Sequence, residues 1–292
     1  MCTTCGCGDE SGTRVTALSD EESTRAHAHH HAGGAHPHRH GGADHHAATS
    51  PATTTIDIEQ RMLAKNDALA TRNRAELDAR EICTVNLMSS PGSGKTSLLV
   101  RTIDELAVHR RLAVIEGDQE TLLDAERIRA TGCEVVQINT GAGCHLDADM
   151  LRRGLDVLDP PAGSLLFVEN VGNLVCPALF DLGETAKVVV ISVTEGDDKP
   201  LKYPHMFAAA DLVVVNKTDL LPYVDFDVDA CASRARSLNQ GLRILPVSVK
   251  TGDGLDGWYS WLQELSATGG ERLAASIPAA SAIRPPTRSA DA

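Results

Sequence analysis

The chain has 292 residues, of which 42% are hydrophobic and only 3% aromatic, so its core must consist mainly of aliphatic side chains. Its 40 acidic residues outnumber its 27 basic residues and give a net charge of −13, which argues against a nucleic-acid partner because no basic surplus exists to displace counterions. No stretch has the roughly 18–20 apolar residues of a membrane span or the apolar leader of a secretory signal. We therefore expect a cytoplasmic protein whose cysteines bind metal or catalyse instead of forming disulfides.

Residues 1–55 contain almost no large apolar side chains, and we predict that they form a disordered tail, because they cannot bury enough surface to offset the entropy of ordering. Three of the eight cysteines, Cys2, Cys5 and Cys7, lie close together at the start of this tail. Thiolates at this spacing can wrap one soft ion, with the chain amine available as a fourth donor. Tetrahedral zinc and planar Ni²⁺ or Cu²⁺ both suit such a set.

The tail also contains a histidine-rich segment at 27–46. Neutral imidazoles on a flexible chain can bind several borderline ions, such as Ni²⁺, Zn²⁺ or Cu²⁺. A purification tag and plain low complexity are the alternatives, and the interruptions by Ala, Gly, Pro and Arg argue against a simple tag. The candidate ligands are His27, His29, His30, His31, His36, His38, His40, His45 and His46.

Residues 56–268 are predicted to form one α/β domain, and residues 269–292 a disordered C-terminal tail. The domain opens with a predicted amphipathic helix at 56–80. Short β-rich apolar runs then alternate with stretches that suit helices, which predicts a mostly parallel sheet with helices on both faces and ligands at the carboxyl ends of its strands. The predicted strands are 82–88, 112–116, 135–138, 164–168, 187–193, 211–215 and 243–247.

The first strand is followed by SSPGSGKTS at 89–97, the position of a P-loop between strand and helix. Backbone amides and the helix N-terminus there attract phosphate, Lys95 is expected to contact the β- and γ-phosphates, and Thr96 to bind Mg²⁺. Ser89 stands where the P-loop consensus has its first glycine, and a glycine-rich structural turn is the alternative. The predicted phosphate-binding residues are Pro91, Gly92, Ser93, Gly94, Lys95, Thr96 and Ser97.

The tetrapeptide NKTD at 216–219 ends a later strand and indicates a guanine site. Asp219 is expected to accept two hydrogen bonds from the guanine edge, a donor pair that adenine lacks, while Asn216 and Lys217 brace the base. A helix cap after the strand is the alternative, which the upstream P-loop disfavours. The residues expected to close over the base are Ser248, Val249 and Lys250.

Two acids, Asp118 and Glu169, follow predicted strands on the same side of the sheet. With Thr96 they can hold Mg²⁺, or they can position the attacking water, so that Lys95, Asp118 and Glu169 are the candidate catalytic residues. Solvation of a strand end is the alternative for each acid. The sequence leaves open which acid contacts the metal and which the water.

A second candidate metal site lies inside the domain. Cys144 and His145 follow the strand at 135–138, and Cys176 lies seven residues beyond Glu169, so these ligands can converge near the γ-phosphate. The other cysteines are predicted to be buried structural thiols. They are Cys83, Cys133 and Cys231.

Five segments of the domain resemble the HypB family, the nickel-incorporation GTPases of hydrogenase maturation. They are SSPGSGKTSLL, TGAGCHLDADML, VENVGNLVCPALFDLGE, VTEGDDKPLKYPHMF and NKTDLLPY. The resemblance covers roughly residues 56–265, and the Cys- and His-bearing N-termini of some members match residues 1–46. It implies a P-loop NTPase of the SIMIBI type that binds GTP and dimerises with its nucleotides facing the interface. It also implies nickel delivery to the [NiFe]-hydrogenase large subunit, with a small zinc-containing accessory protein as partner.

The resemblance further assigns roles to the metal-binding candidates. It implies tight Ni²⁺ binding by Cys2, Cys5 and Cys7, and nickel storage by the histidine-rich segment. It implies a nickel or zinc site formed by Cys144, His145 and Cys176.

Two other functions compete with this assignment. The urease nickel GTPases carry Cys-Pro-His where this chain has Cys144-His145, and they lack the counterpart of Cys176. A nickel store with incidental GTPase activity would explain the tail, but the intact P-loop, both acids and NKTD argue against it because storage needs no nucleotide chemistry.

Overall fold

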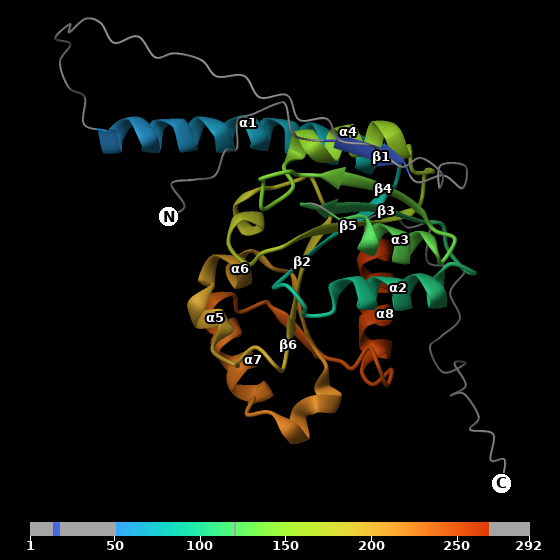
Figure 1. Ribbon diagram of the computed structural model, residues 1–292, viewed down its shortest axis with the longest axis vertical. Helices are drawn as coiled ribbons and strands as arrows, with labels where there is room; N and C mark the ends of the chain where they lie inside the picture. The colour runs from blue at the N-terminus through green and yellow to red at the C-terminus, as the bar shows by residue number, and fades with distance from the viewer. Residues whose placement is uncertain (1–13, 18–50, 120, 269–292) are drawn as a thin grey trace, which may run out of the picture.

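The computed structural model describes residues 14–17, 51–119 and 121–268 (Figure 1). Cys2, Cys5, Cys7, the histidine-rich segment and residues 269–292 therefore lie outside the described residues, and so do the predictions made for them. In the described part of the chain no helix is both long and apolar enough to cross a membrane.

All seven predicted strands are present, with ends that differ from the predicted ones by at most four residues. They are β2 Cys83–Ser89, β3 Leu112–Asp118, β4 Glu134–Asn139, β5 Leu165–Gly172, β6 Ala186–Ser192, β7 Leu212–Asn216 and β8 Arg243–Pro246. Within the described residues these seven strands pair in parallel in the order β4-β3-β5-β2-β6-β7-β8. The predicted α/β fold with a mostly parallel sheet is therefore confirmed.

An eighth strand, β1 (Arg14–Ala17), was not predicted, because residues 1–55 were assigned to a tail. It pairs antiparallel with β4 and extends the sheet beyond it. Val15 packs against an apolar cluster that includes Ile138 of β4 and Leu151 of the helix that follows it. Covering a strand edge supplies backbone hydrogen-bond partners that the average composition of a polar segment does not reveal. Within the predicted tail 1–55, these four residues and residues 51–55 at the start of α1 therefore form regular structure.

Helices cover both faces of the sheet, as expected. They are α1 Pro51–Ala79, α2 Lys95–Leu106, α3 Leu123–Arg129, α4 Ala148–Leu158, α5 Lys199–Lys202, α6 Pro204–Ala209, α7 Val228–Leu238 and α8 Leu255–Thr268, with the 3₁₀ turns η1 Cys176–Leu179 and η2 Thr218–Tyr223. The predicted first helix at 56–80 therefore begins five residues earlier, at Pro51.

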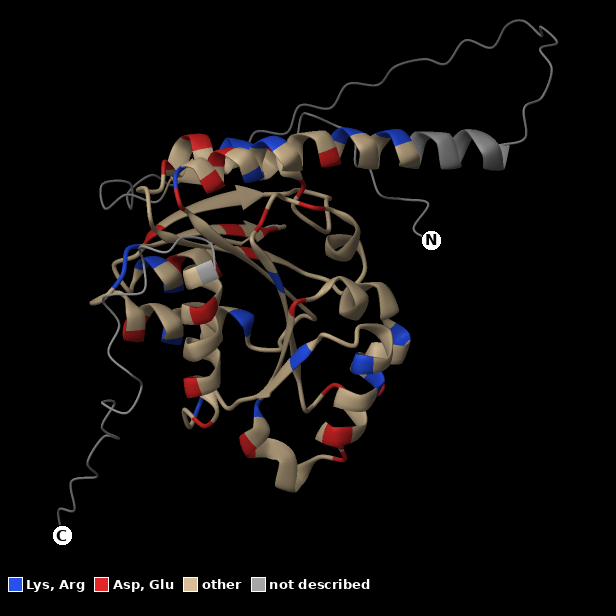
Figure 2. Ribbon diagram, turned by 180° about the vertical axis from the view of Figure 1, so that it is seen from behind, with Lys and Arg blue, Asp and Glu red and all other residues tan. Residues whose placement is uncertain are grey.

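The strand residues alternate between two apolar layers, as the period of two in a β-strand requires. One layer packs α2, α3 and α8 against residues such as Phe167 and Val188. On the other face, α6 and α7 pack on the β6–β7 half, and α1 and α4 pack on the β3–β5 half. Figure 1 shows α1 and α4 side by side across one end of the molecule. Figure 2 shows that Lys, Arg, Asp and Glu lie mainly on helices and loops, and few lie on the strands.

Trp258 of α8 anchors the first layer. Its ring is fully buried, stacks on Trp261 with 5.6 Å between centroids, and donates from Nε1 to the hydroxyl of Thr102 at 2.9 Å. Since the hydroxyl would lose its donor and a large cavity would form, Trp258→Ala should lower the free energy of unfolding by about 3–5 kcal/mol. Urea unfolding followed by circular dichroism measures this. Tyr223→Ala is the control: its side chain is 83% exposed, so its change should stay within about 0.5 kcal/mol.

Candidate functional site

The P-loop segment turns between the end of β2 at Ser89 and the start of α2 at Lys95. Gly92 and Gly94 have φ values of +74° and +98°, which L residues rarely adopt. At Gly94 a Cβ atom would also overlap the side-chain nitrogen of Asn216. Gly94 is therefore required both by backbone conformation and by the close approach of the NKTD segment.

A cleft of about 520 Å³ lies over this turn. Its wall contains the entire segment Ser89–Ser97, the carboxyl ends of β3 and β5, and Lys217. Arg127 of α3 also lines the cleft, donates to the Ser97 hydroxyl at 3.2 Å and pairs with Asp124, although the sequence had not marked it as a candidate. All seven predicted phosphate-loop residues therefore surround one cleft.

The NKTD segment braces the phosphate loop directly. Asn216 is 2% exposed, donates from Nδ2 to the Ser93 carbonyl at 2.9 Å, and accepts from the amide of Val249 at 3.2 Å. Lys217 Nζ donates to the Gly92 carbonyl at 2.7 Å. The predicted base-binding and phosphate-binding loops thus stabilise one another.

The segment at 248–250 joins the same assembly. The Ser248 hydroxyl donates to Asp219 Oδ1 at 2.7 Å. This contact orients the carboxylate that is predicted to bind guanine, and it joins the two segments predicted around the base. Lys250 lies in the turn that follows β8.

The two predicted acids occupy different surroundings. Glu169 lies inside β5, not after the strand, because β5 continues to Gly172; it is 1% exposed. Its Oε1 accepts hydrogen bonds from Lys95 Nζ at 2.9 Å and from the Thr96 hydroxyl at 2.6 Å. One carboxylate thus contacts both side chains that P-loop proteins use for phosphate and Mg²⁺.

Asp118 ends β3, and its Oδ2 accepts from the amide and hydroxyl of Thr121 at 3.0 and 2.7 Å. Burial opposes ionisation of Asp118, but these hydrogen bonds lower its pKa overall. The oxygen donors of Thr96, Asp118 and Glu169 suit Mg²⁺, which prefers hard oxygen ligands. Glu169 Oε2 is buried without a hydrogen-bond partner among the described residues, which also fits an acceptor that can receive a cation.

Glu116 is a further carboxylate in the cleft wall that the sequence analysis did not single out. It is 2% exposed and lies opposite Glu169 in the pairing of β3 with β5. Burial, together with the negative charges of Glu169 and Asp118, raises the pKa of Glu116 to about 8. Its side chain is therefore largely protonated at neutral pH. The only sequence signal of this residue was a charge inside the apolar run LAVIE.

Cys144, His145 and Cys176 come together although 32 positions separate the two cysteines. One ligand atom from each residue lies within 4.8 Å of the others, and the two sulfurs are 3.0 Å apart. The His145 ring stacks on Phe180 with 3.9 Å between centroids. Burial lowers the pKa of His145, which favours the neutral imidazole that metals bind. Two thiols and an imidazole are donors that suit Zn²⁺ or Ni²⁺.

The remaining described cysteines lie apart from this cluster. Cys83 and Cys231 are buried as predicted, whereas Cys133 is only partly buried. Burial raises the pKa of Cys83, and it raises that of Cys231 to about 11 and that of Cys133 to about 12. All three thiols therefore stay protonated at neutral pH.

Two asparagines connect the nucleotide cleft to the cysteine–histidine cluster. Asn170 follows Glu169 on β5, and its Oδ1 accepts from the amide of Leu146, next to His145, at 3.1 Å. Asn173 donates to the Cys144 carbonyl at 3.2 Å. The segment that contains Glu169 therefore also holds the loop that contains two of the candidate metal ligands.

The cluster residues and all the described nucleotide-site residues except Ser248, Val249 and Lys250 fall within a recognised domain. Residues 83–246 match the family CobW/HypB/UreG, nucleotide-binding domain. The hydrogenase maturation factor HypB of Azotobacter vinelandii is 56% identical over 234 residues, which are 80% of this chain and 76% of that protein. The chain belongs to the HypB family. It is therefore a P-loop GTPase and a hydrogenase maturation factor, as the resemblance implied.

The similarity to HypB proteins extends along most of the chain. HypB of Escherichia coli strain K12 is 47% identical over 288 residues, covering 90% of this chain and 98% of that protein. The crystal structure of HypB from Archaeoglobus fulgidus has a TM-score of 0.65 and 40% identity, and covers 70% of this chain and 99% of that one. The structure of HypB from Helicobacter pylori in complex with nickel has a TM-score of 0.67 and 36% identity. It covers 70% of this chain and 96% of that one.

Gly94→Ala should abolish GTP and GDP binding, because a side chain there strains the backbone and displaces Asn216 from the P-loop. Gly132→Ala is a matched control: its φ is +82°, but a Cβ there would meet no atom within 4 Å. Nucleotide titration by calorimetry distinguishes them. Equal losses of nucleotide affinity in both variants would attribute the effect to backbone strain alone. They would contradict the importance of the close approach between Gly94 and Asn216.

The raised pKa of Glu116 predicts a pH-dependent stability. A group with pKa 4.5 when unfolded and about 8 when folded binds its proton more tightly in the folded state, so stability falls as pH rises from about 4.5 to about 8. Between pH 5.5 and 8, Glu116→Gln should remove about 2–4 kcal/mol of this fall. Urea unfolding at both pH values measures it, with Glu134→Gln, an exposed acid at the start of β4, as control. An unchanged pH dependence in Glu116→Gln would show that Glu116 is ionised in the folded state.

Proposed function

We propose that the chain is a GTP-hydrolysing metallochaperone that captures Ni²⁺ and delivers it to the [NiFe]-hydrogenase large subunit. The observation that supports this most is the convergence of Cys144, His145 and Cys176 at a loop held by the residue next to Glu169. The nickel complex of the Helicobacter pylori relative also supports it. Zn²⁺ suits the same donors, so we include it as a second ion for the internal site.

In this proposal the cleft binds GTP with the guanine at Asp219 and the phosphates at the P-loop. Lys95 contacts the γ-phosphate, and Asn216 and Lys217 keep the two loops in register. Mg²⁺, held by Thr96 with Asp118 or Glu169, supplies charge neutralisation for the phosphates when bound. The carboxylate that does not contact the metal orients the attacking water.

The nucleotide state reaches the metal site through β5. A γ-phosphate competes with Glu169 for Lys95, since both are anions that need the same ammonium group. Glu169 must then change its contacts, and the adjacent Asn170 transmits a shift of the strand to Leu146 and thus to His145. Loading and release of the metal are thereby coupled to GTP binding and hydrolysis.

The remaining roles extend the same proposal. Cys2, Cys5 and Cys7 capture Ni²⁺ and the histidine-rich segment stores it. A small zinc-containing accessory protein and the hydrogenase large subunit, or its maturation complex, are the partners. A nucleotide-dependent homodimer is favoured by exposed apolar side chains near the internal site, since Val175 and Leu179, one residue before and three residues after Cys176, are 54% and 50% exposed.

Nickel storage is the competing function, and nucleotide coupling separates the two. The test uses the full-length chain with Cys2, Cys5 and Cys7 changed to Ser, so that a thiolate-to-Ni²⁺ charge-transfer band reports the internal site. Ni²⁺ titrations with GDP and with a non-hydrolysable GTP analogue should differ in affinity by roughly 5–150-fold, and by linkage Ni²⁺ should change the GTP-to-GDP preference equally.

The ligand assignment is tested in the same titrations. Cys176→Ser should remove the band and the difference between nucleotides, whereas Cys133→Ser should change neither, because that thiol lies elsewhere. Equal Ni²⁺ affinity with both nucleotides would refute the coupling and favour a storage or structural role for the site.

A further inference from the structure

Helix α1 presents two asparagines where an apolar side chain would be expected. Its buried face runs through Asn66, Ala70, Asn73 and Leu77, at the spacing of one helical face, and Asn66 and Asn73 are only 6% and 1% exposed. Burying an amide is unfavourable unless its hydrogen bonds are replaced. The partners of these two amides therefore indicate why polar groups are present there.

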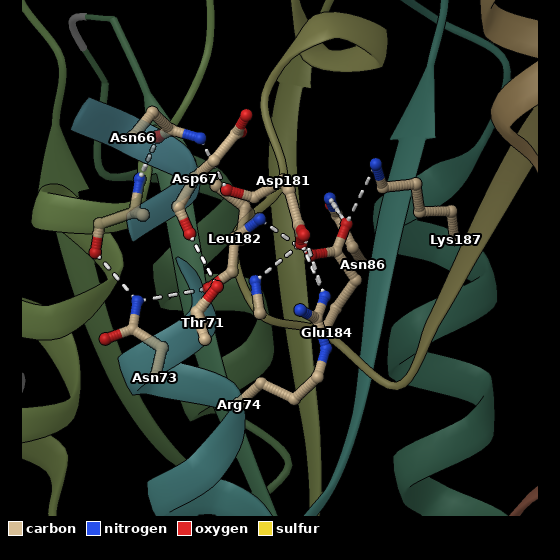
Figure 3. Close-up of polar contacts among 12 residues, drawn as sticks. Asn66, Asp67, Thr71, Asn73, Arg74, Asn86, Asp181, Leu182, Glu184 and Lys187 are labelled. Carbon is tan, nitrogen blue, oxygen red and sulfur yellow. Dashed lines mark hydrogen bonds and ion pairs between the residues drawn. The ribbon is translucent and has the colours of Figure 1, made fainter. Parts of the chain in front are cut away.

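Both asparagines bridge the same two segments (Figure 3). Asn66 donates from Nδ2 to the Asp181 carbonyl at 2.8 Å and accepts at Oδ1 from the amide of Ala148 at 2.9 Å. Asn73 donates to the carbonyls of Ala148 at 2.8 Å and Leu182 at 3.1 Å. Every one of these four bonds ends on backbone, so the contacts fix chain position and not a particular side chain.

The two bridged segments are those that carry the metal-ligand candidates. Ala148 is the first residue of α4, three residues after His145, and its amide is one of the donors that a helix leaves unpaired at its start. Asp181 adjoins Phe180, whose ring stacks on His145, and lies five residues after Cys176. Asn66 therefore links the two segments whose His145 and Phe180 rings stack on one another.

The approach of the second segment to α1 is close. At Gly183, with φ +93°, a Cβ would lie 2.5 Å from the Ala70 carbonyl oxygen and 2.8 Å from the Arg74 nitrogen. Arg74 holds Asp181 through two hydrogen bonds of 2.7 and 2.9 Å, and the carboxylate of Glu184 accepts from the Leu182 amide at 2.7 Å. The segment 181–184 is thus seated directly on the helix.

We propose that Asn66 and Asn73 are positioning residues for the Cys144–His145–Cys176 metal site, holding its two ligand-bearing segments at the separation that metal binding requires. This rests on the metal binding proposed above. Groups that orient metal ligands without touching the ion typically contribute 10–100-fold to affinity. The role predicts a metal-specific defect, since none of the described residues that line the nucleotide cleft belongs to α1.

The experiment uses full-length protein with Cys2, Cys5 and Cys7 changed to Ser, titrated with Ni²⁺ in the presence of GDP. Asn66→Ala and Asn73→Ala should each weaken the Ni²⁺ affinity of the charge-transfer species about 10-fold or more and shift its band, because the ligand geometry loosens. GDP affinity should stay unchanged. Thr71→Ala is the matched control on the same helix, since its hydroxyl donates to the Asp67 carbonyl one turn earlier and to no other residue in the described part of the chain.

Asn66→Asp covers the case in which the alanine variants do not fold. It keeps the shape and the acceptor for Ala148 but loses the donor to Asp181, so an intermediate loss of Ni²⁺ affinity is expected. Folded variants with lower melting temperature but unchanged Ni²⁺ affinity and spectrum would make the asparagines merely structural and overturn the proposal. A parent protein whose spectrum is the same with and without Cys144→Ser and Cys176→Ser would instead refute the metal site itself, and the positioning role with it.

Discussion

Two consecutive residues of β5, Glu169 and Asn170, link the P-loop to the loop of the cysteine–histidine cluster. Because successive side chains of a strand point to opposite faces, Glu169 contacts Lys95 and Thr96 of the P-loop while Asn170 contacts the loop next to His145. Asn170 also donates to Asn86 on β2, the strand that leads into the P-loop, at 3.4 Å. The nucleotide cleft and the cysteine–histidine cluster therefore both contact β5, the strand through which the proposed coupling would act.

The polar groups buried around this strand differ in how they are satisfied, and the difference matches their proposed roles. Asn66 and Asn73 have hydrogen bonds to backbone, as expected of groups that hold structure. Glu116 and Glu169 each have a buried oxygen without a hydrogen-bond partner among the described residues, and the two neighbouring carboxylates repel one another when both are ionised. A proton on Glu116 removes the cost of burying its charge and relieves this repulsion, which is why the pKa of Glu116 is raised.

Mutual support also characterises the nucleotide loops. Asn216 contacts both Ser93 of the P-loop and Val249 of the segment after β8, so one buried amide aligns the loops predicted to bind phosphate and base. These loops leave β2, β7 and β8; β2 lies more than a hundred residues before the other two strands, but the ends of all three meet at one edge of the parallel sheet. The α/β architecture thus converts three short motifs into one site.

The local motifs and the elements that carry them were predictable from the sequence. Seven apolar runs specified seven strands, and SSPGSGKTS, NKTD and the Cys144, His145 and Cys176 set are chemically distinctive where they stand. The tertiary structure alone identified β1, the pairing of Glu116 with Glu169, and the contacts of Asn66 and Asn73. Each of these depends on partners far along the chain: β1 needs the edge of β4, and Asn66 needs Ala148 and Asp181. A buried asparagine in a helix carries no signal of what it will bond, because only the folded sheet brings its partners to it.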